Sequence, residues 1–232
     1  TYKHIEILIV YDDENIDDLK FINEIKKKDK RIVVIQNKKK KKKIVVIKKK
    51  KKKGAGTSRN IGISNSNGKY IAFLDADDIW ETNKLEKQIK FMDTNNLDIS
   101  HTSYYVVNEK KNILGKRFAK NFFLLNELLK SCDIGLSTVV IKKDLINDEI
   151  KFPALKTKED FVLWLQLLRN GKKIYALNEY LTFWTKSKHS LSSSTYQKIL
   201  DGFRVYHKYM KFNFFKSLYF LFCLSINFIL KK

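Results

Sequence analysis

Short apolar runs alternate with amphipathic segments at the start of the chain, and this alternation restricts the fold more than any other feature. Residues 5–10 (IEILIV) form a nearly continuous apolar run, which is typical of a strand buried on both faces of a parallel sheet. Asp17 can cap an amphipathic helix that follows, and residues 32–35 (IVVI) predict the next strand. The chain therefore opens as a β-α-β unit of an α/β fold.

A later strand-like run ends directly in acidic residues. Residues 70–74 (YIAFL) are followed by Asp75, Asp77 and Asp78. Open α/β sheets bind ligands at the carboxyl ends of their strands, and two carboxylates one residue apart can converge on a hard divalent cation that also binds phosphate oxygens. We therefore predict a site here, with the alternative that these acids only form a turn or cap a helix.

The rest of the chain predicts further helices and strands. Asn83 and Glu86 have the spacing of a capping box before a helix that buries Leu85, Ile89 and Met92. Other helices are expected at residues 61–65, 124–131, 158–170 and 197–211, and other strands at residues 99–107, 137–141, 173–177 and 180–184.

Charge and composition narrow the class of protein. The formal net charge is +22, and twelve of these charges come from two six-lysine runs inside a repeated IVVI-K₆ block at residues 38–53, which leaves 22 − 12 = +10 for the rest. The block is either a solvated loop or a polybasic patch for anionic lipid or nucleic acid. Only two cysteines are present, far apart, so neither a disulfide framework nor a zinc cluster is suggested and a reducing compartment fits best.

The C-terminal segment is strongly apolar and aromatic. Residues 214–230 are barely long enough to span a bilayer and include Lys216 and Asn227. We predict that this segment lies in the interface of an anionic leaflet, and the alternative is a helix packed on the core of the domain.

Four segments in this order, EILIVYDD, GAGTSRNIGI, GKYIAFLDADDIW and KTKEDFVLWLQLLRNG, resemble the family 2 inverting glycosyltransferases, most closely bacterial enzymes of surface polysaccharide or lipopolysaccharide synthesis. The resemblance covers residues 1–194. It implies an α/β GT-A fold, a Rossmann-like nucleotide-diphospho-sugar transferase with a mostly parallel central sheet flanked by helices. Residues 195–232 would be a helical, membrane-associating extension, and the chain would start at the family's second strand, without its first.

The resemblance also implies a nucleotide-sugar donor, commonly a UDP-sugar, with Mn²⁺ or Mg²⁺ on its diphosphate. Asp12 would contact the nucleobase and Arg59 would lie near the nucleotide. Asp75 would serve the ribose and diphosphate side, Asp77 would bind the metal together with Asp75, and Asp78 would assist. Glu159 and Asp160 match the family's acidic pair, in which Asp160 is the general base.

After the last expected strand, Lys186 and His189 match basic residues that close over the diphosphate, although an ordinary Ser/Lys loop has the same composition. The implied acceptor is a hydroxyl of a glycan or of a lipid-linked sugar, reached from the inner face of the bacterial cytoplasmic membrane through peripheral contact. Nucleic acid is not expected as a partner. The alternative function is a non-catalytic basic module that binds membrane or nucleic acid on a vestigial GT-A fold.

Overall fold

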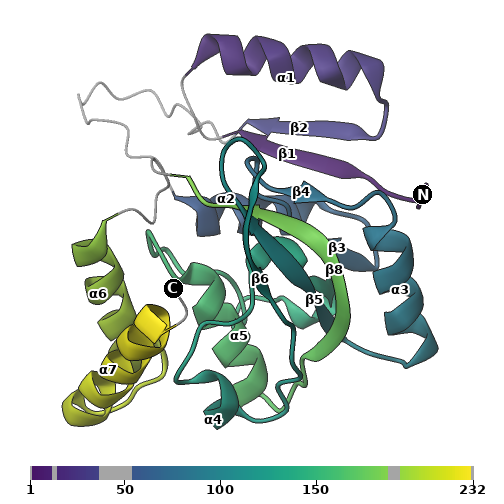
Figure 1. The fold of residues 1–232 in the computed structure, drawn as a ribbon. Coiled ribbons are helices and arrows are strands. Elements are labelled where there is room, and N and C mark those ends of the chain that lie inside the picture. The colour runs from purple at the N-terminus through teal and green to yellow at the C-terminus, as the bar shows by residue number, and fades with distance from the viewer. Residues whose placement is uncertain (1, 12–14, 37–53, 188–193, 231–232) are drawn as a thin grey trace.

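The computed structural model describes residues 2–11, 15–36, 54–187 and 194–230, so Asp12, His189 and the lysine repeat lie outside the described residues. Strands and helices alternate along most of this chain (Figure 1). In chain order they are β1 (Ile7–Tyr11), α1 (Ile16–Lys28), β2 (Ile32–Gln36), α2 (Ala55–Asn65), β3 (Tyr70–Ala72), β4 (Ile79–Trp80), α3 (Lys84–Thr94), β5 (Ile99–Val107), β6 (Ile113–Arg117), α4 (Leu125–Leu128), the 3₁₀ turn η1 (Leu136–Thr138), β7 (Val140–Lys142), the 3₁₀ turn η2 (Lys143–Leu145), α5 (Glu159–Arg169), β8 (Tyr175–Thr185), α6 (Thr195–Arg204), the π-helix η3 (Val205–Tyr209) and α7 (Phe214–Leu230).

The predicted β-α-β unit is confirmed as a separate layer of β1, α1 and β2. β1 pairs with β2 in parallel, and α1 lies beside this pair (Figure 1). The cap of α1 is Asn15 rather than Asp17, because the Asn15 side chain accepts a hydrogen bond from the backbone N–H of Asp17. Asp17 instead lies in the first turn, where its charge suits the positive end of the helix dipole.

The second sheet is mixed, whereas a mostly parallel sheet was expected. Its strand order is β3-β7-β5-β8-β4, with β6 paired to β5. Only β5–β8 is parallel there; the other described pairings in this sheet are antiparallel. One cause is local: a turn at residues 108–112 joins β5 to β6, and so short a connection allows only antiparallel pairing.

Several element boundaries differ from the sequence prediction. The strand expected at residues 137–141 begins only at Val140, because residues 136–138 form η1. α2 begins at Ala55, six residues before the expected start, and so includes Arg59. The two strands expected at residues 173–184 form one strand, β8, whose pairing with β5 shifts register near Ser103 and so absorbs the polar interruption.

α5 forms the centre of the main core, as its helical pattern predicts. Phe161, Leu163, Trp164 and Leu167 are fully buried, and residues of the C-terminal helices pack in the same cluster. The left-handed φ of +76° at Gly171 lies just beyond the end of the helix, where a residue without Cβ adopts it at no steric cost.

The C-terminal segment folds as α6, η3 and α7, which lie side by side (Figure 1). α7 buries Ser217, Phe220 and Leu224, so one of its faces packs on the core as the alternative reading proposed. Among the described helices, none has the length and hydropathy needed to cross a bilayer. The division at residue 194 remains a prediction.

Candidate active site

The acidic residues after β3 form a tight turn, and their side chains differ in exposure. The backbone N–H of Asp78 donates to the Asp75 carbonyl at 3.0 Å and closes the turn. Asp78 is buried, and its carboxylate accepts from the Ser137 hydroxyl at 2.6 Å and from the Thr185 backbone N–H at 2.8 Å. Asp77 is exposed and Asp75 is partly exposed. Asp78 therefore anchors the turn, while Asp75 and Asp77 remain accessible to a ligand.

Ser137 links this turn to a buried lysine. Its hydroxyl also accepts from the Asp75 backbone N–H at 3.1 Å, and its carbonyl accepts from Trp80 Nε1 at 2.6 Å. The ammonium group of the fully buried Lys84 lies 4.4 Å from the centroid of the Trp80 ring and donates to Gln88 Oε1 at 2.7 Å. The inward side of α3 thus supports the acidic turn through an aromatic ring and a serine.

Two residues hold the outer side of the turn. Lys111, at the turn between β5 and β6, donates to the Asp77 carbonyl at 3.0 Å and to Thr185 Oγ1 at 2.9 Å. The Thr185 hydroxyl itself donates to the Asp77 carbonyl. Lys186 follows directly with an exposed side chain. The end of β8 therefore lies against the acidic turn through Thr185, and Lys186 is the next residue along the chain. Its role over the diphosphate stays a prediction.

α2 brings Arg59 between the acidic turn and the start of α5. Arg59 Nη2 lies 2.9 Å from Asp75 Oδ1, and Nη1 donates to Glu159 Oε1. Neighbouring Asn60 exchanges two hydrogen bonds with the backbone of Phe152, at 2.8 and 3.1 Å. These bonds fix α2 against the segment before α5 and so position the arginine.

A glycine allows this close approach. A Cβ on Gly56 would lie 2.6 Å from the Pro153 carbonyl oxygen and 3.3 Å from Glu159 Cγ. Such a contact to backbone is closer than real Cβ atoms make, so the segment would have to move. Gly56 is therefore required by packing next to the acidic pair.

The acidic pair begins α5. Lys158, the residue before it, has a left-handed φ of +63°, which is unfavourable for a side chain with Cβ. Glu159 is buried and bonded to Arg59. Asp160 is half-buried as a residue, and its carboxylate accepts from the Phe161 backbone N–H at 2.7 Å. Of the two carboxylates, Asp160 is the less engaged with the described residues.

Burial and neighbouring charges together set the pKa values of the residues in this site. Burial raises the pKa of Glu159 and of Asp160, and the Arg59 guanidinium opposes both shifts. Burial also raises the pKa of Asp78 to about 6, against its hydrogen bonds from Ser137 and Thr185. For Arg59, burial acts to lower the pKa, but the carboxylates of Asp75 and Glu159 outweigh it and raise the value.

The donor set at the acidic turn suits a cation shared with a ligand. Within the part of the chain that the structure describes, no group of three or more His, Cys, Asp or Glu side chains could hold a metal by itself. Mg²⁺ and similar ions usually take one or two carboxylates together with substrate phosphates and water. Asp77 and the free oxygen of Asp75 fit that arrangement.

The structure thus brings together Arg59, Asp75, Asp77, Glu159 and Asp160, with Lys186 beside the turn. Sequence reasoning missed the residues that hold them. Only the burial of Lys84 could have been predicted from its neighbours in sequence. Lys84 and Gln88 are next to Leu85 and Ile89 in sequence, and they lie on the same buried side of α3. The partners Ser137 and Thr185 lie far away in sequence and carried no local signal.

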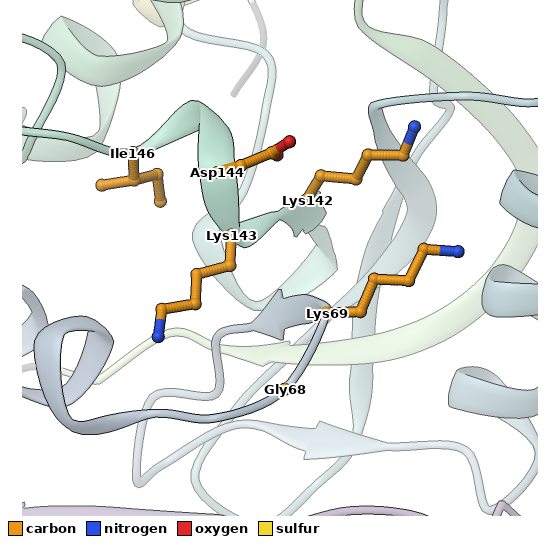
Figure 2. A pocket seen from close by; sticks show the side chains of 6 residues that line it. All are labelled: Gly68, Lys69, Lys142, Lys143, Asp144 and Ile146. Atoms are coloured by element: carbon orange, nitrogen blue, oxygen red, sulfur yellow. The ribbon is translucent and has the colours of Figure 1, made fainter.

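A separate cavity of about 630 Å³ lies at the start of β3, at the end of this strand away from the acidic turn (Figure 2). Its three lysines are already partnered: Lys69 with Asp93, Lys142 with Asp98, and Lys143 with the Ser66 carbonyl. Asp93 and Asp98 offset the charges of Lys69 and Lys142, whereas the Ser66 carbonyl accepts from Lys143 without offsetting its charge. None of the residues lining the cavity is a site residue that the resemblance implies, so the acidic turn remains the candidate site.

Known proteins resemble this chain in sequence. A UDP-Glc:alpha-D-GlcNAc-diphosphoundecaprenol beta-1,3-glucosyltransferase of Escherichia coli, WfgD, is 34% identical over 201 residues, which cover 86% of this chain and 72% of that protein. An uncharacterized glycosyltransferase of Rickettsia conorii is 37% identical over 171 residues, or 72% of this chain. The chain spans about a quarter of that relative, since the match covers 26% of it.

Solved structures resemble the fold. Staphylococcus aureus TarS residues 1–349, in complex with UDP-GlcNAc, superposes with a TM-score of 0.67 at 21% identity over 88% of this chain and 56% of that one. The mannosyltransferase PcManGT of Pyrobaculum calidifontis, in complex with GDP-Man and Mn²⁺, has a TM-score of 0.61 at 10% identity over 90% of this chain and 55% of that one. The expected α/β GT-A fold is confirmed, with a mixed central sheet. Residues 1–140 match Glycosyl transferase family 2, and the chain belongs to that family.

Proposed function

We propose that this chain transfers a sugar from a UDP-sugar to a hydroxyl group of a lipid-linked glycan, with inversion at the anomeric carbon. The bridge from Asp75 through Arg59 to the Glu159–Asp160 pair carries the proposal, because one guanidinium group joins the acidic turn, the proposed donor site, to the acidic pair that contains the proposed base. The named substrates of WfgD and the UDP-GlcNAc bound to TarS support this donor and acceptor class. Such an acceptor favours action at the inner face of the cytoplasmic membrane.

In the proposed reaction, the acceptor oxygen forms a bond to the anomeric carbon from the face opposite the donor phosphate. The bond between that carbon and the phosphate oxygen breaks, and UDP leaves with its electron pair. Asp160 takes the proton of the acceptor hydroxyl, a role that suits a carboxylate with a raised pKa. Arg59 holds the two acidic groups at a constant separation.

Asp77 and Asp75 are the proposed ligands of a Mn²⁺ or Mg²⁺ ion. When bound, such an ion supplies positive charge that offsets the charge of the departing diphosphate. Lys186 supplies a further positive charge beside the turn from the protein itself. Roles for Asp12 and His189 stay predictions, since both lie outside the described residues.

The alternative of a basic binding module depends on the lysine runs at residues 38–53, which lie outside the described residues. Nothing in the described residues favours it over transfer chemistry.

The test is calorimetric titration of the chain with UDP, GDP and dTDP, each with and without Mn²⁺. We expect UDP to bind in a Mn²⁺-dependent manner and Asp77→Asn to weaken this binding by about tenfold or more. Asp148→Asn, which removes an exposed carboxylate elsewhere, is the matched control. Equal binding of UDP by the Asp77→Asn and Asp148→Asn variants would remove Asp77 from the donor site.

A second measurement tests the base. Asp160→Asn should bind UDP as the unmodified chain does but fail to transfer sugar. The product of the unmodified chain, read by NMR, should have the anomeric configuration opposite to that of the donor. Transfer at an unchanged rate, or retention of configuration, would overturn the proposed mechanism.

A further inference from the structure

α7 is apolar on two opposite sides, and only one of them is covered by the described residues. Its inner side packs on the core through Phe220 and Leu224. Its other side carries a second stripe with helical spacing i, i+3, i+4, i+7, i+11 and i+14, and these side chains are exposed, from 39% at Ile226 to 82% at Phe215. We name this stripe the α7 outer face: Phe215, Leu218, Tyr219, Phe222, Ile226 and Ile229.

Such a helix needs an apolar environment on both sides. A helix that is hydrophobic all round is normally buried in a core or in a membrane, and a contiguous exposed apolar patch marks an interaction surface. α7 has 17 residues, and no described helix meets the length and hydropathy required to cross a bilayer. A helix of this kind can instead lie along the membrane interface with one side immersed.

The charges around α7 favour an anionic surface. Arg204 is paired with the buried Asp201, at 3.0 Å between Nη1 and Oδ1. After Asp201 the sequence contains no Asp or Glu, while it contains Lys208, Lys211 and Lys216 before the two terminal lysines. The lysines that precede and follow α7 in sequence are therefore not balanced by acids of the same segment.

Lys216 shows how these charges fit the apolar face. Its side chain is exposed, and its ammonium group lies 4.3 Å from the centroid of the Phe212 ring. A long basic side chain at a membrane interface can lay its stem on apolar surface and still present its charge to lipid headgroups. Association of two copies through the same face would instead bring their lysines together at an unfavourable cost.

We propose that the α7 outer face docks on the surface of an anionic phospholipid bilayer. Phe215 and Phe222 enter the boundary between headgroups and acyl chains, and the flanking lysines contact lipid phosphates. The inference rests on the surface chemistry of α6 and α7 and holds whichever sugar the chain transfers.

The docked helices are joined directly to the candidate active site. Asp201 in α6 accepts from the backbone N–H and the hydroxyl of Thr157, each at 3.1 Å. A Cβ on Gly202 would lie 2.8 Å from Leu221 Cδ1, so α6 and α7 also meet closely. Docking of α7 would therefore orient the start of α5, with its acidic pair, relative to the bilayer.

The test is flotation of the full chain with vesicles of phosphatidylcholine, alone or mixed with roughly a third of phosphatidylglycerol. About 0.5 M NaCl suppresses contacts made by exposed lysines alone, so the remaining binding reports apolar insertion. The double variant Phe215→Ser/Phe222→Ser should lose at least about tenfold in partitioning to the mixed vesicles at this salt concentration. The matched control, Phe21→Ser/Phe118→Ser, removes two phenylalanines that are 63% and 65% exposed elsewhere and should partition like the unmodified chain.

Ser225→Glu is a milder variant that adds a charge beside the α7 outer face without removing a core contact, and it should reduce partitioning in the same direction. It keeps the proposal testable if the double variant does not fold, as judged by its thermal unfolding. Equal partitioning of the outer-face variants and the control would overturn the proposal. So would a dimer in sedimentation velocity without vesicles that the outer-face variants convert to monomer. Neither result concerns UDP binding, which is measured separately.

Discussion

Arg59 Nη2 lies 2.9 Å from Asp75 Oδ1, so a residue of α2 is bonded to the turn that follows β3. The other end of the same guanidinium group donates to Glu159 at the start of α5. A planar group with five N–H donors can bridge two carboxylates in this way, whereas an ammonium group on a flexible stem cannot hold the same geometry.

Arg59→Lys should therefore keep the charge but separate the acidic turn from the acidic pair. We expect kcat/KM for sugar transfer to fall by about tenfold or more, which corresponds to roughly 1.4 kcal/mol. Arg31→Lys, in the exposed Arg31–Asp29 pair, is the control and should change the rate by less than about twofold. Similar rates for both variants would show that the bridge does not matter for transfer.

Gly56→Ala should disturb the same region through packing. The added methyl group would meet the Pro153 carbonyl oxygen at 2.6 Å, so the segment before α5 must shift. Overpacking of this kind costs about 1–3 kcal/mol, which urea unfolding would detect, and we expect weaker UDP binding as well. Gly115→Ala meets no atom within 4 Å and should leave both properties unchanged. A stable Gly56→Ala variant with normal UDP binding would contradict this account.

Ser137→Ala should loosen the acidic turn without altering its carboxylates. The substitution removes one hydrogen bond to Asp78 and one from the Asp75 backbone. We expect the Mn²⁺ concentration required for half-maximal UDP binding to rise by several-fold, about the effect of losing roughly 1 kcal/mol of positioning. Ser64→Ala removes an exposed helical hydroxyl and serves as the control. If both variants need the same Mn²⁺ concentration, Ser137 does not position the turn.

The pH dependence of transfer should follow Asp160. Burial raises the pKa of this carboxyl group, so the base form is lost at a higher pH than for an ordinary aspartate. The acid limb of kcat/KM should therefore lie above about 4, the usual value for Asp. Arg59→Gln removes the opposing positive charge and should move the limb to still higher pH. A limb at or below about 4, or no change in Arg59→Gln, would assign the base elsewhere.

Much of the fold could be predicted because its strongest signals are local. The apolar spacing of α5 predicted which side chains are buried, and the continuous apolar run before Asp75 predicted β3 with the acidic turn after its carboxyl end. The start of α2 could not be predicted in this way. Gly54 and Gly56 read as loop residues, yet Gly56 is small because α2 packs against Pro153, which lies 97 residues away in a segment with no pattern of its own.

The same distinction applies to the site: its ionised residues could be predicted from the sequence, and the residues that position them could not. The resemblance and the sheet rule named Arg59, Asp75, Asp77 and the acidic pair, and the structure brings these side chains together. The residues that hold them are long-range partners: Ser137 lies 59 positions from Asp78, and Thr185 lies 107 positions from it. Hydrogen bonds over such separations depend on how β7 and β8 meet β3 and β4, which no local pattern encodes.

Lys84 gives the last prediction, because a fully buried ammonium group should make stability depend on pH. Burial lowers the pKa of Lys84 to about 7, whereas in the unfolded chain the pKa keeps its ordinary value of 10.5. Between these two values the unfolded chain binds the additional proton, so the free energy of unfolding should rise as the pH rises from 7 toward 10.5, and the effect should vanish below 7. Lys84→Met keeps the volume and removes this titration.

Urea unfolding at pH 7.5 and 9.5 checks the sign. The increase in unfolding free energy between these pH values should be larger in the unmodified chain than in Lys84→Met, by about 1–3 kcal/mol, since one proton contributes roughly 1.4 kcal/mol per pH unit. Lys87→Met removes a lysine whose side chain is 43% exposed and should behave like the unmodified chain. An identical pH response in all three proteins would mean that Lys84 is protonated in the folded state across this range, and that the Trp80 ring and Gln88 stabilise its charge as well as water does.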